Sequence, residues 1–117
     1  MNRLYSLLGT GNYKQCMYEL GDQVAGMTSF VQIAIVELLA NTEYPIEEIV
    51  IFTTAKARER NEYLLRTELE ERDINVPVRF VPVVETLTDQ NMWELFEQVY
   101  DEIHSNDRVF FDITHGF

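Results

Sequence analysis

A run of β-branched and aromatic residues at positions 109–111 is followed at once by the polar sequence Asp-Ile-Thr-His-Gly at positions 112–116. A continuous apolar run of this kind is typical of a strand buried on both faces of a parallel sheet. In an open α/β sheet, ligands bind beyond the carboxyl ends of the strands. The abrupt change to polar residues therefore marks a candidate site. On this motif alone the alternative stays open that Asp112 and Thr114 only cap the next turn.

Segments with strand character alternate with segments of helical character along the chain. Strands are predicted at residues 3–8, 48–52, 76–84 and 109–111, and helices at residues 30–40, 57–73 and 91–104. This alternation indicates parallel strands joined by right-handed crossovers. The predicted fold class is α/β, a Rossmann-like open sheet that is mainly parallel, with the strand order 3-2-1-4 by analogy with doubly wound sheets. Pro77 and Pro82 flank the third strand and place it at an edge.

A glycine turn directly follows the first predicted strand, as Gly-Thr-Gly-Asn-Tyr-Lys at positions 9–14. It begins like a dinucleotide-binding fingerprint, but Lys14 stands where the third glycine belongs, so a dehydrogenase is only weakly indicated. Residues 13–20 contain strand-forming aromatic side chains, and Gly21-Asp22 is typical of a turn. We therefore expect a short excursion such as a hairpin before the first helix.

The first predicted helix, residues 30–40, is apolar nearly all round and should be buried on more than one side. Packing between the sheet and a second subunit would satisfy it, and Thr28 or Ser29 is the expected N-cap. The charged face of residues 57–73 should carry ion pairs four residues apart, namely Glu62 with Arg66 and Glu68 with Arg72. The last helix has apolar residues at helical spacing, which predict a core stripe of Met92, Leu95, Phe96, Val99, Tyr100 and Ile103.

The chain of 117 residues fits one domain and is strongly acidic, with a formal net charge of −11 and a pI near 4.4. This charge argues against nonspecific binding of long nucleic acid, although helix N-termini and backbone amides can still bind small anions. The single cysteine, Cys16, excludes an internal disulfide, fits a reducing cytoplasm and is expected to be a small buried residue. No membrane partner is expected, because the longest apolar window, residues 30–40, is too short to span a bilayer.

Three polar segments each follow a predicted strand, and the strand order brings them to one edge of the sheet. The candidate ligand-binding residues after the first and fourth strands are Gly9, Thr10, Gly11, Asn12, Tyr13, Asp112, Thr114, His115 and Gly116. The second strand and the start of the last helix contribute Thr53, Thr54, Lys56, Asn91 and Trp93. This convergence favours a ligand site over the capping alternative.

The residue types at this edge suit a phosphate-bearing ligand. Glycine lets the backbone amides approach a phosphate closely, and the hydroxyl and amide side chains offer neutral hydrogen bonds. Lys56 adds charge at a helix start, where amides already point toward an anion. Tyr13 and Trp93 could stack on a base, although Trp93 is at least as compatible with a core position. Asp112 is expected to anchor loop amides or a ribose hydroxyl rather than to contact phosphate.

Four segments in this order resemble the CRISPR-associated Rossmann-fold (CARF) domain. They are Leu-Gly-Thr-Gly-Asn-Tyr at 8–13, Thr-Thr-Ala-Lys-Ala at 53–57, Trp-Glu-Leu-Phe at 93–96 and Asp-Ile-Thr-His-Gly-Phe at 112–117. The closest similarity is to the sensors of type III CRISPR effectors that often carry a HEPN ribonuclease domain. The resemblance implies a cytoplasmic homodimer that binds cyclic oligoadenylate, most often the tetra-adenylate, across its two-fold axis in antiviral defence. Some members of the family also cleave the ring.

The chain departs from the family where it stops, at Phe117, because relatives continue into a helix, further strands and usually an effector domain. Residues 1–117 are expected to be a single CARF-like sensing domain, either a truncated sensor core that lacks this continuation or a minimal standalone member, and they contain no HEPN signature. Three functions stay open: a cyclic oligoadenylate sensor, a metal-independent ring nuclease, and a generic nucleotide or small-anion binder. His115 and Lys56 are the candidate catalytic residues for the nuclease. Neither a cofactor nor a metal site is expected, because the sequence lacks a carboxylate cluster or histidine pair.

Overall fold

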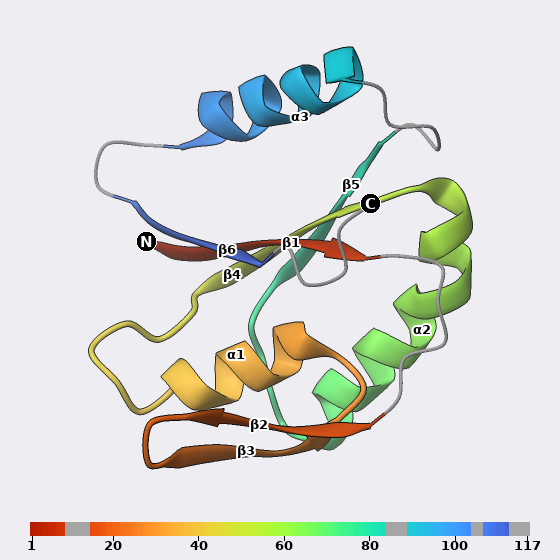
Figure 1. Cartoon of the computed structure of the whole chain (residues 1–117). Helices are drawn as coiled ribbons and strands as arrows, with labels where there is room; N and C mark the ends of the chain where they lie inside the picture. The colour runs from red at the N-terminus through yellow and green to blue at the C-terminus, as the bar shows by residue number, and fades with distance from the viewer. Residues whose placement is uncertain (9–14, 84–88, 104–106, 113–117) are drawn as a thin grey trace.

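The strands of the central sheet all run in the same direction (Figure 1). The computed structural model describes residues 1–8, 15–83, 89–103 and 107–112. Within them the sheet consists of β1 (Asn2–Leu8), β4 (Glu48–Thr53), β5 (Val78–Pro82) and β6 (Arg108–Asp112), in the order β5-β4-β1-β6. Counted along the chain, these are the third, second, first and fourth strands of that sheet. The predicted α/β class is confirmed, the sheet is compatible with a Rossmann-like open sheet, and β5 lies at an edge.

The helices cover opposite faces of the sheet. Helix α1 (Val31–Leu39) and helix α2 (Ala55–Glu71) lie on one face, and helix α3 (Asp89–Glu102) lies on the other (Figure 1). Alternation along β1 explains how both faces are filled, because Leu4 packs with the residues of α1 and α2 whereas Tyr5 packs with Leu95 of α3. The direction of winding therefore changes between the adjacent strands β1 and β6.

Strand β4 is apolar on both sides, as expected for a strand in the middle of a parallel sheet. Ile49 and Ile51 point into the core under α1 and α2, whereas Val50 and Phe52 point into the core under α3. These four side chains are at most 3% exposed. Burial of each contributes roughly 1.5–3 kcal/mol relative to exposure, so β4 anchors both layers of the fold.

A two-stranded antiparallel hairpin covers the outer side of α1. It consists of β2 (Cys16–Leu20) and β3 (Gln23–Thr28), joined by a turn in which Gly21 adopts a positive φ of 59°. The expected excursion after the first strand is therefore confirmed as a hairpin. Ala25 and Tyr18 of the hairpin pack on the outer residues of the helix. The hairpin thus covers the outer side of α1 within the same chain, and the predicted contact with a second subunit stays a prediction.

Two local predictions at the hairpin and α1 are wrong. Cys16 is exposed instead of buried, because its strand is the outermost layer of the molecule. The N-cap of α1 is Phe30, with no side-chain cap, instead of Thr28 or Ser29. Thr28 lies two residues before this N-cap, and its Oγ1 accepts a hydrogen bond from the backbone N–H of Phe30 over 3.1 Å. The threonine thus fixes the entry to the helix without capping it.

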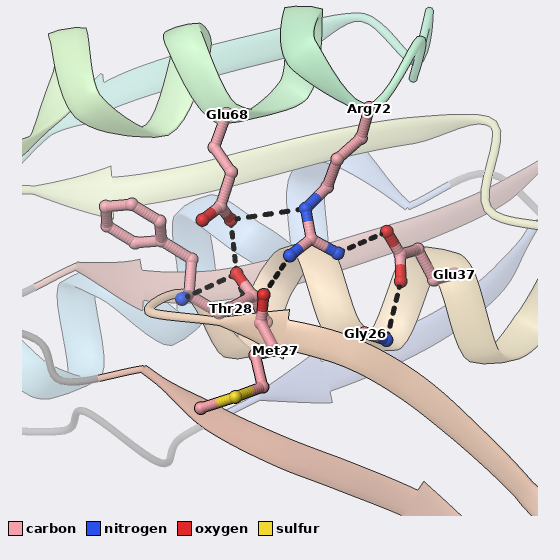
Figure 2. A network of polar contacts seen from close by, with 7 residues as sticks. Gly26, Met27, Thr28, Glu37, Glu68 and Arg72 are labelled. Carbon is pink, nitrogen blue, oxygen red and sulfur yellow. Dashed lines mark hydrogen bonds and ion pairs between the residues drawn. The ribbon is translucent and has the colours of Figure 1, made fainter.

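The end of α2 is tied to α1 and to β3 by the guanidinium of Arg72 (Figure 2). Its Nη1 lies 2.6 Å from Oε1 of Glu37, and its Nη2 donates to the carbonyl oxygen of Met27. The predicted pair with Glu68 is confirmed, at 3.9 Å, and Glu68 also accepts from the hydroxyl of Thr28. Glu37 in turn accepts from the backbone N–H of Gly26 over 3.3 Å. We call these contacts the Arg72 network.

The predicted pair of Glu62 with Arg66 is also confirmed, with Nε of Arg66 3.2 Å from the carboxylate. Arg58 joins the same carboxylate over 2.9 Å. Both arginines lie over the ring of Phe80 on the edge strand β5. This part of α2 therefore covers the ring of Phe80 in addition to carrying solvated charges.

The core stripe predicted on α3 is only partly correct. Leu95 is buried and Ile103 packs against the same cluster, but Tyr100 is 77% exposed. Five residues of helix turn the chain by about 500°, which places Tyr100 on the side of α3 away from Leu95. The side chains of Met92, Phe96 and Val99 lie outside the described residues.

Candidate functional site at the carboxyl edge of the sheet

The carboxyl ends of β1, β4 and β6 lie at one edge of the sheet. Leu8 is the register partner of Thr53 on one side of β1, and Ser6 is the partner of Asp112 on the other. Because the winding changes between β1 and β6, this is the position at which open α/β sheets bind ligands. Eight of the candidate residues lie outside the described part of the chain, namely Gly9, Thr10, Gly11, Asn12, Tyr13, Thr114, His115 and Gly116. Their roles stay predictions.

The opposite edge of the sheet is occupied by paired charges. Arg3 lies between two carboxylates there, with Nη1 2.6 Å from Asp107 and Nε 3.0 Å from Glu48. Each side chain of this triad is less than one quarter exposed. Such a triad holds the starts of β1, β4 and β6 together, and Arg79 brings a second positive charge to 3.8 Å from the carboxylate of Glu48. The edge at the amino ends of the strands thus has a structural role, and the edge at their carboxyl ends is the candidate site.

Asp112 ends β6 as a buried carboxylate, only 6% exposed. Its Oδ2 accepts a hydrogen bond of 2.7 Å from the hydroxyl of Ser6 on β1. The oxygen of Ser6 accepts in turn from Nε2 of Gln32 on α1 over 2.8 Å, and Nε2 also donates to the carbonyl of Leu7 over 3.2 Å. This Asp112–Ser6–Gln32 network joins two strands and a helix directly beneath the candidate site.

The amide oxygen of Gln32 has an unusual environment. The side chain is fully buried, and Oε1 has no hydrogen-bond partner in the described part of the chain. Exchanging the two amide atoms would not help, because Oε1 would then face the carbonyl oxygen of Leu7. A buried polar atom without a partner costs roughly 1–3 kcal/mol, so its retention calls for an explanation. The network therefore ends in an acceptor that suits an N–H or O–H donor.

The threonines predicted at the end of β4 serve the fold in this structure. Thr53 is buried, and its hydroxyl donates to the carbonyl of Leu8 over 3.2 Å, which fastens β4 to β1. Thr54 is the N-cap of α2, and its Oγ1 accepts from the N–H of Ala57 over 3.1 Å. The hydroxyl of Thr54 is only partly buried, so its own proton can still be donated at the edge.

Lys56 lies exposed in the first turn of α2, two residues after the cap. None of the ion pairs found among the described residues includes it. The first turn of α2 carries no acidic side chain, so the positive end of the helix dipole is not neutralised locally. Lys56 and the amides of this turn together give the carboxyl edge a positively charged part.

The remaining candidates lie on α3. Asn91 is half-buried near the start of the helix, and Trp93 is 70% exposed. Trp93 is two residues from Leu95, which is about 200° around the helix, so it lies on the side away from the sheet. The structure therefore brings Asp112, Thr53 and Thr54 to one edge but does not bring Trp93 to them.

Three residues near Asp112 were not singled out from the sequence. Ser6 and Gln32 complete the buried network, and Tyr18 of the hairpin lies close enough to feel its charge. Burial raises the pKa of the Tyr18 phenol, and the charges of Cys16 and Asp112 raise it further. Ser6 and Gln32 are polar residues within otherwise apolar segments, and this pattern could have indicated a buried hydrogen-bond network.

Within the described residues, no three metal-ligating side chains lie together, and no helix is long and apolar enough to cross a membrane. Comparison of the chain with protein-family models, with curated proteins and with solved structures finds no match.

Proposed function

We propose that this domain is a sensor that binds cyclic tetra-adenylate at the carboxyl edge of its sheet, within type III CRISPR antiviral signalling. The observation that carries the proposal is the buried Asp112–Ser6–Gln32 network at the change of winding between β1 and β6. A position of this kind is where open α/β sheets take nucleotides. The resemblance of the motifs around it to CARF domains selects the ligand class.

The edge combines two kinds of chemistry that a nucleotide needs. Asp112, at the end of β6, is an acceptor that is suited to a ribose hydroxyl or an adenine amino group and unsuited to phosphate. Lys56 and the start of α2 are donors with positive charge, suited to phosphate. A ligand that carries hydroxyl groups and phosphates on the same scaffold would use both parts.

Homodimerisation is part of the proposal, since the ring would lie across a two-fold axis. Helix α1 gives it no independent support, because the hairpin already covers the outer side of that helix. Sedimentation with and without the ring tests this part separately. A monomer that stays a monomer when the ring is bound would contradict the dimeric sensor.

The decisive experiment is titration of the full chain with labelled cyclic tetra-adenylate, followed by chromatography of the ligand. An intact bound ring supports the sensor. A linear product with a cyclic-phosphate end, formed equally in EDTA, would identify the ring nuclease instead, with His115→Ala and Lys56→Ala as the variants that assign its chemistry. A ring that is neither bound nor cleaved would leave only the generic small-anion binder.

Variants at the edge locate the binding. Lys56→Ala removes a charge-assisted contact and should weaken affinity by about 1.5–3 kcal/mol. Arg79→Ala is the control, because it removes one positive charge from the start of β5, near the opposite edge. Equal losses in the two variants would mean that only the overall charge matters and would contradict a site at the carboxyl edge.

A further inference from the structure

The outer face of α3 carries exposed aromatic rings among carboxylates. Trp93, Glu97, Tyr100 and Asp101 line a shallow hollow of about 510 Å³. The side chain of Trp93 is 70% exposed and that of Tyr100 is 77% exposed. We call these four residues the α3 outer face.

The position of the α3 outer face on the helix explains why the sheet cannot cover it. Leu95 is a buried contact of α3 with the sheet, and Trp93 and Tyr100 lie roughly 140–200° away from it around the helix. Exposed apolar side chains that lie together, rather than singly, mark candidate interaction surfaces. Tyr and Trp are also the residues that supply most binding energy at protein interfaces.

The charged residues of helix α3 are all acidic. Residues 89–102 contain no lysine or arginine. Glu94, Glu97 and Asp101 take part in none of the ion pairs found in the described ranges of the chain. The whole chain has a formal net charge of −11, which adds to the negative potential at this surface. A phosphate-bearing ligand would be repelled, so this face is distinct from the nucleotide site proposed above.

We propose that the α3 outer face docks an arginine-bearing segment of a partner protein. A guanidinium can stack on the indole of Trp93 or the phenol of Tyr100 and donate paired hydrogen bonds to Glu97 or Asp101 at the same time. A lysine ammonium has no planar face to stack and no fork of donors, so arginine fits this combination better. The inference goes beyond the proposed function, because it assigns a protein-binding surface on the opposite layer of the fold.

The test uses Trp93 as its own reporter, because it is the only tryptophan in the chain. The probe is a synthetic peptide of four Arg-Gly-Gly repeats, titrated into the full chain while tryptophan emission is recorded. We expect saturable binding with a change in emission, and binding about threefold to tenfold weaker for the matching Lys-Gly-Gly peptide. Tyr100→Ala should weaken binding of the arginine peptide by a similar factor without changing the net charge.

Nonspecific attraction to an acidic protein is separated by a charge-matched pair of variants. Glu97→Gln with Asp101→Asn should weaken binding clearly, whereas Glu59→Gln with Glu70→Gln, on the exposed side of α2, should not. Circular dichroism of each variant excludes unfolding as the cause.

Three results would overturn the proposal. The first is equal weakening by the α2 and α3 variants, which would make the binding a matter of net charge. The second is equal affinity for the two peptides together with unchanged affinity in Tyr100→Ala. The third is quenching of Trp93 by cyclic tetra-adenylate without any response to the peptide, which would assign the indole to the nucleotide.

Discussion

The outer side of helix α1 and the outer side of helix α3 face opposite directions from the same sheet, and they differ in whether another part of the chain buries them. On α1, Ala34 and Leu38 lie under the β2–β3 hairpin and are at most 8% exposed. On α3, Trp93 and Tyr100 lie at the surface with carboxylates around them. The apolar outer side of α1 is thus covered within the chain, whereas the aromatic and acidic outer side of α3 is exposed in the described part of the chain and is the surface for which we propose a partner.

Introducing a charge on each outer side should give the largest difference. Ala34→Glu places a carboxylate at a fully buried position, and we expect a loss of about 4 kcal/mol or failure to fold. Tyr100→Glu makes the matched change on α3 and should alter stability by no more than about 0.5 kcal/mol. Urea unfolding measures both, and comparable losses would show that the α3 outer face is part of the core.

The Arg72 network should account for the next largest effect, because it fastens the hairpin to both helices. Arg72→Met leaves Glu37 and Glu68 without their partner, and we expect about 2 kcal/mol of lost stability, allowing for partial exposure of the pair. Arg66→Met removes a more exposed ion pair of the same helix and should cost about 0.5 kcal/mol. If the two variants unfolded at the same urea concentration, the Arg72 network would not stabilise the contact of the hairpin with the two helices.

Thr54 offers a smaller effect that separates folding from binding. Thr54→Ala removes the N-cap of α2 and should cost about 1 kcal/mol, and Thr54→Ser should recover most of it. Thermal or urea unfolding of the three proteins gives the comparison. An alanine variant with unchanged stability but impaired ligand binding would show that the hydroxyl belongs to the ligand and not to the cap.

The smallest effect concerns Tyr18, which covers α1 from the hairpin. Its pKa is raised in the folded state, mainly by burial and then by Cys16 and Asp112. Its contribution to stability is therefore fully present below its ordinary pKa of about 10 and is lost as the pH rises through the folded-state pKa. We expect the urea midpoint of the parent to fall more between about pH 9.5 and 11 than that of Tyr18→Phe. Identical falls would mean that the phenol is not held in the protonated form.

The strands and helices could be predicted from local sequence patterns, whereas the segments that pack on the outer sides of the helices could not. The alternation of strands and helices, the edge prolines and the turn at Gly21-Asp22 are local signals, and the α/β class and the hairpin are confirmed by the structure. The same apolar helix, however, can be covered by a subunit or by a hairpin, and the pattern of its residues does not say which; the structure shows that the hairpin packs on it. Tyr100 was misplaced because a stripe of six apolar residues is wider than the side of α3 that reaches the sheet.

The candidate site was predictable in its location and less so in its chemistry. The residues after each strand pointed to the carboxyl edge, and Thr53, Thr54 and Asp112 lie there. The contact between Ser6 and Asp112 spans 106 residues and depends on strand register, which no local pattern reveals. Threonine is also ambiguous by nature, because the hydroxyl that could bind phosphate is the one that caps α2.

Hydrogen exchange with and without cyclic tetra-adenylate tests the central claim, that the nucleotide site is the carboxyl edge of β1, β4 and β6. We expect slower exchange on ligand binding in peptides that cover residues 5–14, 53–58 and 109–117. Peptides that cover residues 93–101, on the α3 outer face, should exchange as before. Protection confined to residues 93–101, or none despite bound ligand, would contradict the site.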